Sequence, residues 1–147
     1  MSHIESIELV LSDLEALEAG AKRFEGQLVK QSTYRWFGKS VGDYPLPKGM
    51  TKEDLGKCDY AIKLPGVNYE VGVVKVEGGY RLAYDFYGYD RSEHDGHKLK
   101  AIFGDQLSKL RQAYAAEIAK KVAKRKGWRV KETTLPNGAL KLQFAGM

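Results

Sequence analysis

The hydrophobic pattern at the start of the chain predicts a strand followed by a helix. A short apolar stretch over residues 4–10 is typical of a strand. Ser12 and Glu15 then match a capping box, with Ser12 as the N-cap of a helix. Apolar residues recur every three or four positions over residues 14–24. We therefore expect a helix of roughly three turns that ends at Gly26.

The next part of the chain alternates between apolar and polar positions, which is typical of half-buried strands. The alternation begins at Tyr34 and Trp36 and resumes over residues 60–64. Between these segments, residues 38–57 hold four glycines and two prolines. Loops of that length inside a domain are usually functional or mobile, so we interpret this stretch as a loop insertion.

A hairpin is predicted for residues 69–76 and 80–86. Gly78-Gly79 stands between the two strands and can supply the positive φ angles that a tight turn requires. The second strand carries aromatic and leucine side chains on one face and Arg81, Ala83 and Asp85 on the other. This alternation favours a sheet with one apolar face.

The last third of the chain predicts a long amphipathic helix and a second hairpin. Apolar residues recur at helical spacing over residues 99–126, which is about 40 Å of helix if it is unbroken, and Gly127 ends it. Residues 128–135 and 139–144 then form strands joined through Asn137-Gly138, a signal for a type I′ turn.

The order of these elements predicts an α+β fold for one domain over residues 1–147. Strands in consecutive runs with short connections favour a largely antiparallel sheet. We expect a two-layer sandwich in which one short and one long amphipathic helix cover the same face of the sheet.

Short motifs along the chain occur in a recognisable order: Met1-Ser2-His3 with Ile7, Asp13-Leu14, Tyr34-Arg35-Trp36-Phe37-Gly38, Cys58-Asp59-Tyr60-Ala61-Ile62, Tyr80 with Asp85-Phe86-Tyr87-Gly88, Gln112 with Tyr114-Ala115, and Gly127-Trp128. In this order they resemble the hypothetical chloroplast reading frame thirty-five family, a domain of unknown function in plastids, cyanobacteria, other bacteria and phages. The segments 38–57 and 90–98 depart from the family pattern as insertions. The resemblance supports the fold and implies no activity.

Composition narrows the class of protein. The 147 residues are 43% hydrophobic and 29% charged, which excludes a disordered or collagen-like chain. No apolar run is long enough to span a membrane, and the start of the chain does not match a signal peptide. Cys58 is the single cysteine. We therefore expect a soluble, cytoplasmic protein.

The net charge of +5 is unevenly distributed. Residues 98–131 hold eleven Lys and Arg against Asp105 and Glu117, a net charge of +9, so the rest of the chain is mildly acidic. Seven cations follow one another at and beyond the end of the long helix: Lys120, Lys121, Lys124, Arg125, Lys126, Arg129 and Lys131. The helix dipole favours one or two of them, not all seven. The cluster indicates a non-enzymatic binding or accessory protein whose partner is nucleic acid or an acidic protein. Self-association is left open.

A second hypothesis places a small-molecule or nucleotide site on the sheet. Charged residues alternate along the predicted strands: Arg35, Asp59, Lys63, Glu70, Arg81 and Asp85. Ordinary cross-strand pairing explains such a pattern best. A ligand site would combine Arg35, Phe37, Arg81 and Tyr87 with the 38–57 loop.

No motif assigns catalytic chemistry. Gly38-Lys39-Ser40 lacks the preceding glycine and following helix of a phosphate-binding loop. Cys58 has no identifiable base beside it. Metal-ligand types cluster only in a polar segment that includes His94 and His97, with the acids Asp90, Glu93 and Asp95. We predict no catalytic residue, metal or cofactor.

Overall fold

The computed structural model describes residues 4–36 and 55–146, and the side chains from Leu11 onward within these ranges. The elements are β1 (Ile4–Leu11), α1 (Leu14–Lys22), β2 (Gln27–Lys30), β3 (Tyr60–Leu64), β4 (Val67–Val76), β5 (Gly79–Asp85), α2 (Asp95–Phe103), the 3₁₀ turn η2 (Asp105–Leu107), α3 (Ser108–Arg125), β6 (Arg129–Thr134) and β7 (Leu140–Ala145). The predicted α+β fold is confirmed. Most of the predicted 38–57 insertion lies outside the described residues, as does Phe37.

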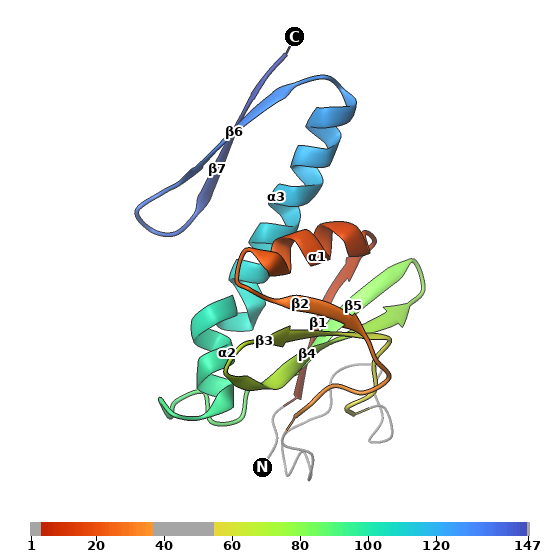
Figure 1. Ribbon diagram of the computed structural model, residues 1–147, viewed down its shortest axis with the longest axis vertical. Helices are drawn as coiled ribbons and strands as arrows, with labels where there is room; N and C mark the ends of the chain where they lie inside the picture. Colours follow the sequence, from red (N-terminus) through yellow and green to blue (C-terminus); the bar gives the residue numbers. More distant parts are fainter. Residues whose placement is uncertain (1–3, 37–54, 147) are drawn as a thin grey trace.

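Five strands form an antiparallel sheet in the order β1-β5-β4-β3-β2 (Figure 1). Strands β2 to β5 are neighbours in both sequence and space, whereas β1 pairs with β5 at the far edge. The register places Leu82 of β5 opposite Val73 of β4, and Val71 opposite Ile62 of β3. The expectation of an antiparallel sheet is therefore confirmed.

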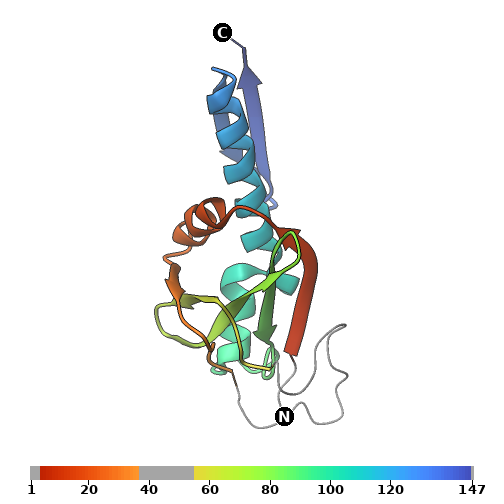
Figure 2. The same ribbon diagram turned by 90° about the vertical axis from the view of Figure 1, so that its right-hand side faces the viewer.

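One face of the sheet packs against all three helices and η2. Val71 and Val73 of β4 are fully buried on this face, in the same cluster as Leu17 of α1, Phe103 of α2 and Leu110 of α3. The helices lie together on this side of the sheet, and the far end of α3 continues beyond it (Figures 1 and 2). Burial of these apolar surfaces is the main source of stability for the layer.

The prediction of a strand at Tyr34 and Trp36 is wrong. The strand that follows α1 is β2, and residues 34–36 instead cross the second face of the sheet. Tyr34 is buried there with Cys58, Ala61 and Ala83. The alternation of aromatic and polar residues was real, but it marks a segment that lies on the sheet rather than in it.

The predicted N-cap is also shifted by one residue. Asp13, not Ser12, caps α1, because its Oδ1 accepts a hydrogen bond of 2.9 Å from the N–H of Ala16. The backbone N–H groups of Ser12 and Asp13 both donate to the hydroxyl of Tyr114 on α3, at 3.2 Å. A local hydrogen bond therefore caps the helix, and a residue remote in sequence accepts from the two N–H groups before it.

The predicted long helix over 99–126 is broken. Helix α2 ends at Phe103, and Gly104 has φ 84° and ψ 171°, which no helix accommodates. Gln106 and Leu107 follow with φ values of 52° and 57°, in the left-handed region. The break redirects α3 away from the sheet. Its end is as predicted, because Gly127 has φ 71° directly after the helix.

Both hairpin turns differ in detail from the prediction. Val76 pairs with Gly79, so the first turn is Glu77-Gly78 rather than Gly78-Gly79. In the second hairpin Leu135 bonds to Ala139 and the N–H of Gly138 donates to the Leu135 carbonyl at 2.8 Å. That loop holds three residues, and Gly138 has positive φ whereas Asn137 does not. Pro136 occupies the first central position of the turn, where its ring fixes a negative φ. A type I turn accepts this φ, whereas the predicted type I′ turn requires a positive φ at both central residues.

Candidate functional site

The C-terminal part of the chain forms an arm, which we define as residues 117–146. It consists of the last two turns of α3 and the β6–β7 hairpin, and it extends away from the five-stranded sheet (Figures 1 and 2). The hairpin contacts α3, and most of its residues are exposed. A two-stranded hairpin is marginally stable by itself, so its packing on α3 is what holds it.

Strand alternation gives the hairpin an inner and an outer face. Glu132 and Leu140 face α1 and α3, where they line an open groove with Arg23 and Lys120. The outer face consists of three cross-strand pairs: Arg129 with Ala145, Lys131 with Gln143, and Thr133 with Lys141. It therefore carries three cations and no carboxylate.

Two of the seven predicted anion-binding residues are used inside the protein. Lys120 forms an ion pair of 2.9 Å with Glu132, and Lys121 forms one of 2.8 Å with Asp13. A hydrogen bond from Lys121 lowers the pKa of Asp13, and hydrogen bonds from Lys120 and Arg23 lower the pKa of Glu132. The Lys121–Asp13 pair links the arm to the start of α1, and the Lys120–Glu132 pair holds β6 against α3 within the arm. Both lysines are therefore less available to a partner than an unpaired cation.

The other five cations are exposed and have no carboxylate partner among the described residues. They are Lys124, Arg125, Lys126, Arg129 and Lys131. The structure adds Lys141, which the sequence analysis missed because it lies outside the basic run. Its position opposite Thr133 follows from the hairpin register, so strand alternation was the signal that could have found it. We call these six residues the basic surface.

Arg23 links the arm to α1. Its guanidinium donates to Oε1 of Glu117 at 2.8 and 3.1 Å and to both oxygens of Glu132 at 2.9 and 3.0 Å. The three side chains are only partly exposed, which strengthens the interaction relative to a surface pair. One arginine thus bridges α1, α3 and β6.

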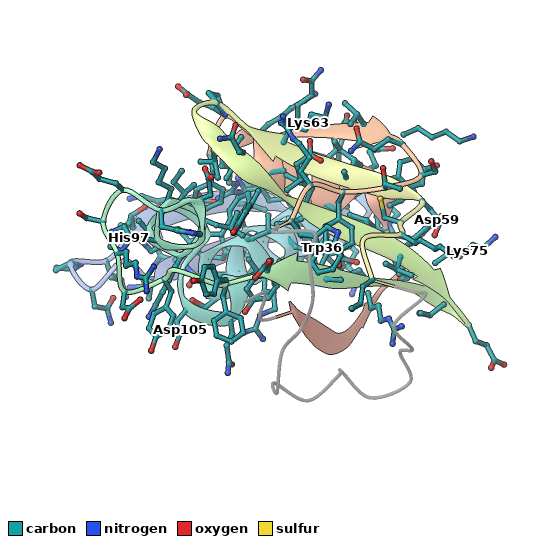
Figure 3. The ribbon with its side chains drawn as sticks, turned by 90° about the horizontal axis from the view of Figure 1, so that it is seen from below. Trp36, Asp59, Lys63, Lys75, His97 and Asp105 are labelled. Carbon is teal, nitrogen blue, oxygen red and sulfur yellow. The ribbon has the colours of Figure 1, made fainter. Side chains whose placement is uncertain are left out.

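The residues of the second predicted site lie in two different surroundings. Arg35 crosses the second face of the sheet, where its Nε lies 3.4 Å from Oε2 of Glu70. Tyr87 follows β5 and its ring contacts His94, with centroids 5.1 Å apart. Arg81 is half-buried in β5. Figure 3 shows Trp36 beneath the sheet and His97 well away from it on the α2 side.

Glu70 organises the second face of the sheet. Its carboxylate is only 1% exposed, and Oε1 accepts hydrogen bonds from the N–H of Arg35 at 2.7 Å and from Gln31 at 3.0 Å. Lys63 of the neighbouring strand lies 3.7 Å from Oε2. Asp59 similarly accepts from the N–H of Lys75 at 2.6 Å, at the edge seen in Figure 3. The contacts of Glu70 with Gln31 and Arg35 attach residues 31–36 to the sheet, and the Lys63–Glu70 pair joins neighbouring strands as cross-strand pairing predicts.

The residues considered for metal or nucleophilic chemistry have structural surroundings. His94 caps α2, since its Nδ1 accepts from the N–H of Gly96 at 3.3 Å, and Nδ1 of His97 lies 2.8 Å from the Tyr89 carbonyl. Within the described ranges no three His, Cys, Asp or Glu side chains group as metal ligands. Burial raises the pKa of the Cys58 thiol to about 11, which disfavours the nucleophilic thiolate.

A cavity of about 280 Å³ lies between β5, α2 and η2. Its walls combine apolar and aromatic side chains with a few polar ones. The lining residues are Tyr84, Phe86, Tyr89, Gly96, Leu99, Lys100, Gly104, Asp105, Gln106 and Leu107. The Lys100 ammonium lies 4.7 Å from the centre of the Tyr89 ring. The sequence analysis missed this cavity because the break between α2 and α3 supplies one of its walls.

No protein-family model matches the chain, and comparisons with curated proteins and with solved structures also find no match. The resemblance to the chloroplast reading frame family therefore stays a prediction. None of the helices in residues 4–36 and 55–146 has the length and apolar character needed to cross a bilayer.

Proposed function

We propose that this chain is a small non-enzymatic binding protein that holds nucleic acid on the basic surface of its arm. The observation that carries the proposal is the separation of the cations into two groups. Lys120 is paired with Glu132 of β6 and Lys121 with Asp13 at the start of α1, whereas the six residues of the basic surface have no carboxylate partner among the described residues.

Like charges placed close together repel one another and collect counterions. A polyanion that replaces those counterions releases its own as well, and this release drives binding. The helix end contributes Lys124, Arg125 and Lys126, while the hairpin contributes the other three. The basic surface therefore extends along two elements rather than around one point.

The outer face of the hairpin favours nucleic acid over an acidic protein. Apart from Ala145, its residues between the cations are Thr133 and Gln143, which are common phosphate-contacting types. The centre of a protein–protein interface is instead depleted in Lys and enriched in aromatic residues. A two-stranded ribbon also fits the major groove of duplex DNA.

The test is a fluorescence-anisotropy titration of the full chain with duplex DNA and RNA over a range of NaCl concentrations. We expect affinity to fall steeply with salt. Lys131→Gln with Lys141→Gln should weaken binding and reduce the salt slope by about two. The matched control is Lys30→Gln with Lys75→Gln, which removes the same charge from exposed positions outside the arm.

Equal losses in the arm variant and the control would contradict a specific role for the basic surface. Absence of binding at micromolar protein and low salt would reject the nucleic-acid proposal. Binding to polyglutamate but not to nucleic acid would assign the surface to an acidic protein instead.

The cavity beside η2 supports a second candidate function, the binding of a small molecule. Its volume of about 280 Å³ is near the lower end for ligand pockets, and the strained Gln106 and Leu107 form part of its wall. A thermal-shift screen with nucleotides and aromatic metabolites tests this candidate. A ligand that raises the unfolding temperature of the native chain more than that of the Tyr89→Ala variant would support this candidate. If no ligand changes the unfolding temperature, the candidate is rejected.

A further inference from the structure

The distal end of the arm exposes two aromatic rings that contact each other. Trp128 is 40% exposed and Phe144 is 47% exposed, and their ring centroids lie 6.3 Å apart at an interplanar angle of 61°. Large apolar rings left in water retain a hydrophobic driving force for contact with a partner. We call this pair the aromatic end of the arm.

A cation lies against the aromatic end. The Lys126 ammonium lies 4.7 Å from the centre of the Trp128 ring, whereas Arg129 lies on the outer face of the hairpin and Phe144 on the inner face. Gly127, whose φ is 71°, turns the chain here from the helix into the hairpin and places these residues together. Lys126, a residue of the basic surface, therefore joins that surface to the aromatic end.

We infer that the aromatic end binds unpaired nucleotides of a single strand, with bases stacked on Trp128 and Phe144 and phosphates contacted by the neighbouring cations. This inference rests on the proposed function and specifies its substrate class. Every base has an aromatic face, so such stacking is tolerant of sequence. A duplex keeps its bases stacked on one another and offers none to the two rings.

The interleaving of rings and cations distinguishes this surface from an ordinary hydrophobic contact. Single-strand binding proteins combine aromatic side chains for the bases with a positive surface for the backbone. An apolar partner would have to desolvate Lys126 in order to cover the Trp128 ring, which is unfavourable. A phosphate backbone has the opposite charge and is attracted by the same residue.

The first experiment measures the affinity of the full chain for a 20-nucleotide oligo(dT) and for a duplex of the same length. We expect Trp128→Leu and Phe144→Leu each to weaken oligo(dT) binding by roughly fivefold or more and to change duplex binding little. Trp128→Phe keeps a ring and should restore most of the affinity. Leu135→Ala is the matched control, because Leu135 is a 37% exposed apolar side chain of the same hairpin but has no aromatic ring.

The second experiment does not require a change at the aromatic end. In a Trp36→Phe background, Trp128 is the one tryptophan in the chain, and oligo(dT) should quench its fluorescence while the duplex does not. Lack of quenching, or equal losses for oligo(dT) and duplex in the leucine variants, would overturn the stacking inference. Salt-dependent binding that survives these results would leave the proposed function intact. If neither oligonucleotide binds, both proposals fail.

Discussion

Gly72 lies in β4, the middle strand of the sheet, directly beneath the ring of Tyr34. A Cβ at this position would overlap the ring, and Tyr34 is only 2% exposed. We expect Gly72→Ala to lower the free energy of unfolding by about 1–3 kcal/mol, because the ring and residues 31–36 must shift. Urea denaturation measures the change.

Gly146→Ala is the control for this substitution, since its Cβ would have no neighbour closer than 3.8 Å. A Gly72→Ala variant as stable as the native chain would mean that Tyr34 does not rest on the sheet in solution. A smaller loss in the Tyr34→Ala background than in the native chain would show directly that the ring causes the effect.

Cys58 gives a second prediction at this scale. Its Sγ donates to the Gln31 carbonyl at 3.3 Å, and burial raises its pKa to about 11. At pH 8 it therefore has roughly a hundredfold less thiolate than an exposed cysteine and should react correspondingly slowly with iodoacetamide. Mass spectrometry can follow Cys58 beside an exposed reference introduced by Thr133→Cys. Equal labelling rates at the two positions would contradict the buried site.

The sequence pattern identified the right residues at this scale but not always their surroundings. Tyr34 and Trp36 alternate with polar residues as strand residues do, yet Tyr34 packs on top of Gly72. Local alternation cannot distinguish the two arrangements, because the glycine that accommodates the ring is far away in sequence. The Asp13 cap was missed for a different reason, because Ser12 and Asp13 are neighbouring residues of types that both cap helices.

At the scale of the element, the break between α2 and α3 separates two helices that share one hydrophobic stripe. Phe103, Leu107 and Leu110 are all buried, so the stripe continues across the break and predicted one helix. Hydrophobic periodicity records which side chains face the core but does not record φ. Gly104 was a signal for the break, because it alone among these residues adopts φ 84° without strain from a Cβ.

The break between α2 and α3 contains a position where substitution by glycine should stabilise the protein. Gln106 has φ 52°, where a side chain causes strain that glycine would relieve. We expect Gln106→Gly to raise the free energy of unfolding by about 0.5–1 kcal/mol, whereas Ala115→Gly, at an exposed position inside α3, should lower it by about 1 kcal/mol. Thermal unfolding compares the two variants. Destabilisation of both by the same amount would show that residue 106 is helical in solution.

At the scale of the whole molecule, the sequence predicted that positive charge is concentrated near the C-terminus. It did not predict which of these cations form ion pairs within the protein and which remain exposed without a carboxylate partner. Lys120 pairs with Glu132 and Lys121 pairs with Asp13. Asp13 is 108 residues away from Lys121 in the sequence. Only the packing of α1 against α3 brings Asp13 within reach of Lys121. The antiparallel sheet followed from short connections, whereas the position of β1 beside β5 required the folded structure.

The attachment of the arm should weaken in acid. Hydrogen bonds from Lys120 and Arg23 lower the pKa of Glu132 below its usual value of 4.5, so its contribution to stability is present above that pH and is lost as the pH falls through the lowered value. We expect amide hydrogen exchange in β6 and β7 to accelerate relative to β4 as the pH is lowered from 4.5.

Glu132→Gln should produce faster exchange in the hairpin already at pH 7 and a smaller change on acidification. Glu77→Gln removes the same charge from an exposed turn and serves as the control. Parallel acceleration of exchange in β4 and in the hairpin would show that the whole fold loosens together and that Glu132 has no separate role.

The pairing of β1 with β5 also constrains the order of events during synthesis. Strands β3, β4 and β5 can each pair with the strand before it on leaving the ribosome, but Ile4 finds its partner only when Asp85 has been made. Until then the nascent chain carries β1 with unpaired backbone groups and α1 without α3 to cover it. During translation there is therefore a period in which the N-terminal part of the chain is exposed to chaperones. This period ends when α3 leaves the ribosome and packs against α1.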